Sequence, residues 1–251
     1  MPRCFDPLDT ATAGMGFSSE AGALRYATAR KVWVNDCAPP ARLPRGAPME
    51  LARFAVAGDT LEAATAHVEQ ALGVPLQPGG QHQVFGTHNA LLGLEGGLYL
   101  EAIAIDPGAT PERSPRWFDL DRFFGPPRIG NWICRCDDLD ATLATLAAQE
   151  VDAGQPVSLT RGDLSWQMAV PETGILPFDN CCPALMQWQG PHPATRLTQQ
   201  GCGLRRLIIC HPEADRLRAM LALPDARVVF EAGPADIRAE IDTPHGVRTL
   251  A

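Results

Sequence analysis

The chain has no apolar run that approaches the roughly 18 residues needed to span a membrane as a helix. It also has little positive charge: 21 basic residues face 29 acidic ones and the formal net charge is −8, whereas a nucleic-acid binder normally presents a basic face. It contains no glycine-rich dinucleotide motif, Walker loop, Gly-x-Ser-x-Gly elbow or zinc-type Cys-x2-Cys pair. We therefore predict no membrane and no nucleic-acid partner, and we exclude the nucleotide-dependent and serine-hydrolase classes.

Lysine is almost absent, and the single residue, Lys31, lies in an N-terminal stretch without sustained periodicity. This stretch, residues 1–48, ends in a proline-rich segment and lacks the charged, apolar and small-residue regions of a secretory signal. We predict an irregular arm at 1–48, with the alternative that translation starts at Met49. A chain without such a signal is expected to be cytoplasmic and to keep its eight cysteines reduced.

Three segments repeat one pattern, a short strand-like run followed by an acidic turn and the start of a helix. They begin at Arg53, Asn131 and Arg206, at spacings of 78 and 75 residues. Such a repeat indicates a duplicated supersecondary unit. We predict two modules of order β-α-β-β-β, a crossover between them, and a third, partial module of order β-α-β-β. The predicted boundaries are 49–107 and 128–190 for the full modules, 108–127 for the crossover and 203–251 for the partial module.

Local signals predict where the elements of these modules begin and end. The first helix is expected to start after Asp59 or Thr60 and to end at Gly73, because apolar residues recur at helical spacing between them. The proline-rich crossover carries four aromatic residues, and it either covers a site as a lid or packs on the sheet. The predicted strands are 52–57, 81–85, 89–94, 98–105, 129–136, 156–160, 164–170, 184–189, 204–210, 226–232 and 237–242.

Several short motifs occur in a set order along these modules, and together they resemble the glyoxalase-like branch of the vicinal oxygen chelate superfamily over about residues 50–250. The resemblance implies an α+β fold in which paired βαβββ modules form a curled mixed sheet, or cup. The superfamily includes isomerases, lyases, dioxygenases and antibiotic-binding proteins, so the fold does not determine the function. The motifs are Gly-Gly-Gln-His at 79–82, Gly-Thr-His-Asn-Ala-Leu-Leu at 86–92, Tyr-Leu-Glu at 99–101, Asp-Asp-Leu-Asp at 137–140, and Pro-Ala-Leu-Met-Gln-Trp at 183–188.

The resemblance also implies where a metal would bind, on the first and last strand of each module. Aligning the acidic turns places Arg53, Glu101, Asn131 and Gln187 at those four positions. Only Glu101 is a good ligand, and a guanidinium group has no lone pair for a cation. We therefore predict no metal cofactor there, and we predict that Arg53 replaces the ion and pairs with the buried Glu101 carboxylate.

Strand alternation also predicts which side chains line the cup. Arg135 is expected to receive a carboxylate or phosphate of a ligand in bidentate fashion. In the alternative, Arg53 and Arg135 satisfy protein carboxylates and no ligand binds. The predicted ligand-binding residues are Arg53, His82, Tyr99, Asn131, Arg135 and Gln187.

Two histidines near the cup rim leave the chemistry open. His82 and His88 could join Glu101 as a 2-His-1-carboxylate set for a divalent first-row metal. His88 could instead act as a general acid or base, which makes His88 and Glu101 the catalytic candidates. A third interpretation is that residues 86–89 form a structural turn.

These residues predict a protein that binds, and in one version transforms, a small anionic, oxygen-rich metabolite in the cup without a metal. The alternatives are a metal-dependent isomerase, lyase or dioxygenase, and a scaffold whose cup is filled by side chains. Two modules in one chain complete a cup, so a monomer or a homodimer is compatible with each of these alternatives.

Overall fold

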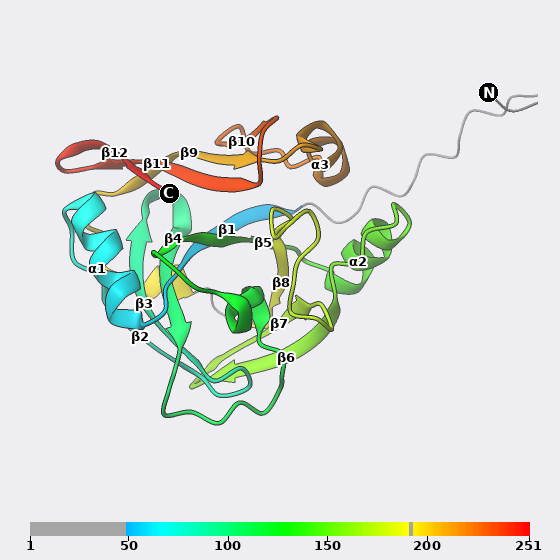
Figure 1. The fold of residues 1–251 in the computed structure, drawn as a ribbon, viewed down its shortest axis with the longest axis horizontal. Helices are drawn as coiled ribbons and strands as arrows, with labels where there is room; N and C mark the ends of the chain where they lie inside the picture. The colour runs from blue at the N-terminus through cyan, green and yellow to red at the C-terminus, as the bar shows by residue number, and fades with distance from the viewer. Residues whose placement is uncertain (1–48, 191–192) are drawn as a thin grey trace, which may run out of the picture. The chain divides into compact units, whose positions relative to one another are not determined.

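The computed structural model describes residues 49–190 and 193–251, and the predicted arm at 1–48 lies outside these ranges. The described strands form two sheets (Figure 1). An eight-stranded sheet has the order β2-β3-β4-β1-β5-β8-β7-β6, and a four-stranded sheet has the order β10-β9-β11-β12. None of the helices in these ranges has the length and apolar character needed to cross a membrane.

The first module follows its predicted order. Thr60 caps the helix because its hydroxyl accepts a hydrogen bond from Ala63 N, and Gly73 ends it in the left-handed region at φ 73°. The prediction of the second strand at 81–85 is wrong, since the strand begins earlier, in a proline-glycine segment that is paired with β3. The elements are β1 (Glu50–Ala57), α1 (Leu61–Leu72), β2 (Gln77–His82), β3 (Thr87–Leu94) and β4 (Leu98–Ile105).

Glycine explains how β2 pairs at this place. A Cβ atom at Gly79 would lie 2.0 Å from Asn89 Oδ1, so only a residue without a side chain lets the strands approach. The prolines and glycines of β2 therefore permit pairing that their composition argues against.

The second module repeats the first, and its helix begins at Asp138, whose carboxylate accepts from Ala141 N. In each module the last strand runs parallel to the first, as β4 does to β1 and β8 to β5. An antiparallel β1–β5 pair joins the two halves, which confirms the predicted paired modules in one curled sheet. The elements are β5 (Arg128–Arg135), α2 (Leu139–Ala147), β6 (Gln155–Arg161), β7 (Leu164–Val170) and β8 (Ala184–Trp188).

The third segment differs from the prediction in two ways. It has a fourth strand, and its strand order is not that of the other modules. The strand parallel to β9 is β10, which directly follows the helix, whereas in the first module the strand parallel to β1 is the last one. The elements are β9 (Gly203–Cys210), α3 (Ala214–Leu221), β10 (Val228–Glu231), β11 (Asp236–Thr243) and β12 (Gly246–Leu250).

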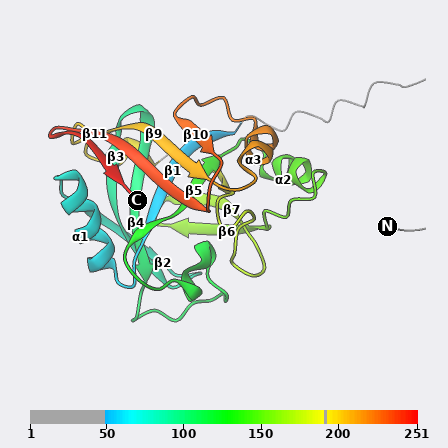
Figure 2. The same cartoon turned by 45° about the horizontal axis from the view of Figure 1, so that its top comes forward.

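The two faces of the large sheet have separate clusters of buried apolar residues. One cluster joins the outer face of β1 and β5 to α1, α2 and the small sheet, which forms a layer over β1 and β5 in Figures 1 and 2. The other fills part of the concave face, where the crossover packs Trp117, Phe118 and Leu120 from the 3-10 turn Trp117–Arg122. The crossover therefore packs on the sheet, which is one of its two predicted roles.

Candidate functional site

The concave face of the first module holds a buried ion pair between adjacent parallel strands. Arg53 of β1 lies opposite Tyr99 of β4 in the register, and Glu101 follows two residues later on the same face. Arg53 Nε lies 3.0 Å from Glu101 Oε2, and Arg53 Nη1 donates to the Tyr99 hydroxyl at 2.8 Å. Arg53 is 5% exposed and Glu101 2% exposed, so the predicted pairing is confirmed in a buried setting.

The pair is held in its charged form. Burial acts to raise the pKa of Glu101, but the charge of Arg53 and the hydrogen bond from Asn89 outweigh it, so the pKa lies below its usual value. Burial likewise acts to lower the pKa of Arg53, and Tyr99 and Glu101 together raise it. Each ion thus makes the burial of the other tolerable.

A hydrogen-bonded network extends from this pair across the cup. Asn89 donates its Nδ2 to Glu101 Oε1, and its Oδ1 accepts from Gly80 N at 2.8 Å. Arg161, at the end of β6 in the second module, brings Nη1 to 3.5 Å from both Asn89 Oδ1 and His82 Nε2. The network therefore contains two arginines and one carboxylate, and it connects the two halves of the cup.

Arg161 was not among the residues predicted to line the cup. The sequence presents it as the start of an Arg-Gly-Asp hairpin turn, which is a common surface feature. Only the approach of the edge strands β2 and β6 brings it to His82. A strict alternation from Leu159, which faces the cup, would have placed Arg161 on the same side.

Two predicted lining residues lie elsewhere. Gln187 accepts a hydrogen bond from Leu139 N at 3.0 Å, so it faces α2, and Met186 occupies the concave face, 3.1 Å from Arg53 Nη1. The parallel register pairs Ile133 with Ala184 and Arg135 with Met186, so Ala184 and Met186 share the concave face and Gln187 lies on the opposite one. Arg135 is exposed at the end of β5, where it pairs with Glu50.

His88 is also misplaced by the prediction, whereas His82 is not. On β3 the inward residues are Thr87, Asn89 and Leu91, and His88 shares the opposite face with Ala90, which belongs to the cluster around α1. His88 therefore cannot join His82 and Glu101 around one ion. The register excludes the 2-His-1-carboxylate set, and it removes His88 as an acid or base in the cup.

The donor set at the implied metal positions does not fit a divalent ion. The corrected set is Arg53, Glu101, Asn131 and Met186. Both Glu101 oxygens are engaged, Oε2 by Arg53 and Oε1 by Asn89, and a guanidinium occupies the centre of the set. Within 49–190 and 193–251, no group of three His, Cys, Asp or Glu residues is arranged to hold a metal ion.

Hydrogen-bonding groups without a partner face the apolar half of the cup. Asn131 lies beside Ala55 on the concave face and is 1% exposed, yet neither its Oδ1 nor its Nδ2 has a partner in the described structure. The same holds for the buried indole nitrogens of Trp117 and Trp166. The ring of His82 lies edge-on to both indoles, at centroid distances of 5.0 and 6.5 Å.

The buried His82 is expected to remain neutral well below pH 6. Burial is the main cause that lowers its pKa from 6.5 to about 4. The charge of Glu101 acts to raise this pKa, and the charges of Arg161 and Arg53 act to lower it. The unfolded chain therefore takes up a proton at a higher pH than the folded one. The contribution of His82 to stability is present above pH 6.5 and is lost as the pH falls towards about 4.

An NMR titration of the His82 ring should show the lowered pKa, and His82→Gln should flatten the pH dependence of unfolding in this range. A ring that titrates near its usual value would contradict the prediction.

Comparisons with known proteins agree with this architecture. The family model described as a glyoxalase-like domain matches residues 54–223. Among solved structures, a hypothetical protein from Staphylococcus aureus has a TM-score of 0.55 at 15% identity, over 75% of this chain and 88% of that chain. Methylmalonyl-CoA epimerase from Mycobacterium tuberculosis has a TM-score of 0.37 at 21% identity, over 58% of this chain and 91% of that chain. The search of curated proteins gave no match. At 15% identity the likeness to the Staphylococcus aureus protein concerns the fold alone.

Proposed function

Because the chain belongs to the glyoxalase-like domain family, we propose that its cup binds a small, anionic, acceptor-rich metabolite without using a metal ion. The predicted resemblance to the vicinal oxygen chelate fold is confirmed, and the ligand is our proposal. The family covers several chemistries, so the argument comes from the residues of this cup.

The observation that carries the proposal is the set of unpartnered donors on the concave face. Trp117 and Trp166 offer indole N–H groups, and Asn131 offers two N–H donors and one acceptor oxygen. A buried polar group without a partner costs about 1–3 kcal/mol, so three such groups on the concave side of the sheet require an explanation. A ligand rich in acceptor oxygens, such as a carboxylate or phosphate, would satisfy more of these groups than a donor-rich one.

The charge of the network supports an anion. Arg53 is neutralised by Glu101, which leaves Arg161 as the second cation. Arg161 is partly buried and forms no ion pair with a carboxylate among the described residues. A guanidinium group in this position is suited to a bidentate carboxylate or phosphate.

Binding is better supported than catalysis. Glu101 has a lowered pKa and both its oxygens are engaged, so it is a weak base. His82 is neutral, but its Nδ1 lies 3.0 Å from Thr87 Oγ1 and its Nε2 faces Arg161. We therefore propose a binding role for Glu101 and His82, in which they position Arg161 and Asn89 towards the ligand.

Replacing Asn131 by leucine is expected to stabilise the free protein and to weaken ligand binding. The change removes a buried amide that has no partner, so the free energy of unfolding should rise by about 1–3 kcal/mol, as measured by chemical denaturation. The matched control is Asn89→Leu, since Asn89 is also buried but its amide is engaged at both ends. This control should lose stability; a loss of stability in both variants would contradict the proposal.

The ligand class is tested by thermal shift with small carboxylates and phosphate esters. A compound that raises the melting temperature of the wild type should lose its effect in Arg161→Gln and in Asn131→Leu. Ligand linkage gives about 2.7 kcal/mol at 100-fold excess over the dissociation constant, which is well within detection. If no compound stabilises the wild type, the scaffold alternative is favoured. A stoichiometric divalent metal that is lost in Glu101→Ala would overturn the metal-independent proposal.

A further inference from the structure

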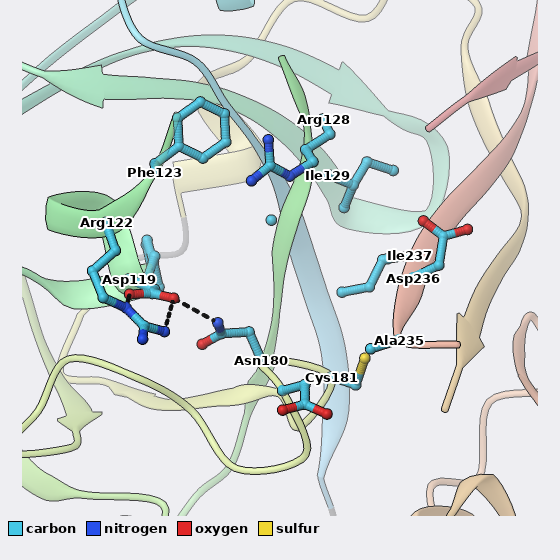
Figure 3. Close-up of a pocket in the computed structure, with 13 residues that line it drawn as sticks. Asp119, Arg122, Phe123, Arg128, Ile129, Asn180, Cys181, Ala235, Asp236 and Ile237 are labelled. Atoms are coloured by element: carbon cyan, nitrogen blue, oxygen red, sulfur yellow. Dashed lines mark hydrogen bonds and ion pairs between the residues drawn. The ribbon is translucent and has the colours of Figure 1, made fainter. Parts of the chain in front are cut away.

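A hollow lies outside the cup, between the crossover, the start of β5, the loop before β8 and the turn between β10 and β11. Its volume is about 210 Å³, which is enough for a small organic molecule. Figure 3 shows its open centre, with Arg128 and Phe123 on one side and Asn180 and Cys181 on the other. Ile237, from the small sheet, forms part of the same lining.

Arg128 is the cation of this lining that forms no ion pair among the described residues. Its Nη1 donates to the carbonyl oxygens of Phe124 and Pro126 at 3.1 and 3.3 Å, and its guanidinium lies over the Phe123 ring at 4.3 Å. Among the described residues it forms no ion pair, and its Nε and Nη2 have no acceptor. The ring contact and the carbonyls orient the guanidinium and leave one edge free to bind an anion.

The other charged groups around the hollow already have partners. Asp119 binds Arg122 through two contacts of 2.7 Å and also accepts from Asn180 Nδ2 at 3.0 Å. Asp236 lies 3.1 Å from Arg238 Nε. Asp179 is exposed to solvent and lies 3.4 Å from His211 Nε2, which balances its charge only when the histidine is protonated. Arg128 is therefore the cation of this lining that is left to bind an anionic group.

One wall of the hollow is apolar and buried. Ile129 and Ile237 are 4% and 5% exposed, and Cys181 is 2% exposed. Burial raises the pKa of the Cys181 thiol to about 11, so this sulfur is neutral and behaves as a small apolar group. An arginine without an ion pair beside an apolar wall matches a ligand with one anionic group and a hydrocarbon body.

We infer that this hollow is a binding site for a small monocarboxylate with an apolar body, whose carboxylate contacts Arg128 and whose body lies against Ile129 and Ile237. The site is separate from the proposed cup ligand and rests on different residues. An aryl or short alkyl carboxylate is the class that fits the volume and the charge.

The test uses the full chain labelled with carbon-13 at the isoleucine δ1 methyl groups and titrated with benzoate. Binding in this hollow should shift the signals of Ile129 and Ile237. It should not shift the signals of Ile103 and Ile133, because these residues lie on the concave face of the cup. Benzamide has the same shape without the charge and should bind at least about tenfold more weakly. Shifts confined to Ile103 and Ile133 would overturn this site while supporting the cup, so the two proposals fail separately.

Two variants and a control complete the test. Arg128→Gln should weaken benzoate binding about tenfold or more, because the charge-assisted contacts are lost. Ala235→Trp should block the hollow from an exposed position on its rim without changing the buried core. Arg248→Gln removes an exposed arginine of β12 that has no ion pair in the described structure, and it should change nothing. Benzoate shifts that persist unchanged in Arg128→Gln, or their absence in the wild type, would overturn the inference.

Discussion

Replacing Arg53 by methionine is expected to lower the free energy of unfolding by about 3–5 kcal/mol at neutral pH. The change leaves the Glu101 carboxylate, which is 2% exposed, without its opposite charge. It also removes the donor to the Tyr99 hydroxyl. Chemical denaturation of the wild type and the variant measures the difference.

The double variant Arg53→Met/Glu101→Leu distinguishes the net contribution of the ion pair to stability from the cost of leaving one buried charge unpaired. A buried ion pair replaced by apolar residues of similar size often costs little, so the double variant should recover most of the lost stability. Arg205→Met is the control, because the Arg205–Asp242 pair is also an arginine–carboxylate pair but lies on the surface. The denaturation midpoint of this variant should change little. If Arg53→Met and Arg205→Met had equal effects, the buried pair would not stabilise the cup.

The pH dependence should change sign between the wild type and Arg53→Met. In the wild type the pKa of Glu101 is lowered, so the contribution of the pair is present above the usual glutamate value and is lost as the pH falls through the lower, folded value. Without Arg53, burial alone raises the pKa of Glu101. The folded variant then holds its proton to a higher pH than the unfolded chain, so its deficit should shrink as the pH is lowered.

Alternation within a strand predicted the inner face of the first module correctly, because β4 and β1 begin and end where their apolar runs do. Arg53, Tyr99 and Glu101 all lie where the pattern placed them. The same rule failed for Gln187, since the loop before β8 has a length that no local signal defines and a shift of one residue reverses the face. His88 was assigned to the cup by its chemistry, although alternation places it opposite Asn89.

The contact of Arg161 with the first module was beyond the sequence pattern. Arg161 reaches His82 and Asn89 only because two edge strands meet, and nothing local in either strand encodes that approach. The third repeat shared its strand, turn and helix with the other two. Its different strand order arises after the helix, where β10 pairs directly with β9, and a repeat of that length does not carry this information.

The small sheet should be part of one cooperative unit with the large one, and Trp132 tests this. Trp132 lies on the outer face of β5 with no exposed surface, donates its indole N–H to Cys181 O at 2.8 Å, and lies edge-on to Phe230 of β10 at 6.2 Å. Trp132→Ala is expected to lower the free energy of unfolding by about 3–5 kcal/mol, because it leaves a large cavity between the sheets. Trp132→Phe keeps most of the volume and should lose less.

Phe124→Ala is the control for this prediction, since Phe124 is an aromatic residue that is 79% exposed, and its loss should change stability little. Far-ultraviolet circular dichroism and tryptophan fluorescence should report one shared transition for Trp132→Ala, at a lower denaturant concentration than for the wild type. Two separated transitions would mean that the third segment folds independently. In that case the hollow at Arg128, which needs Ile237 from the small sheet beside Ile129 from the large one, would depend on a docking equilibrium rather than on a fixed core.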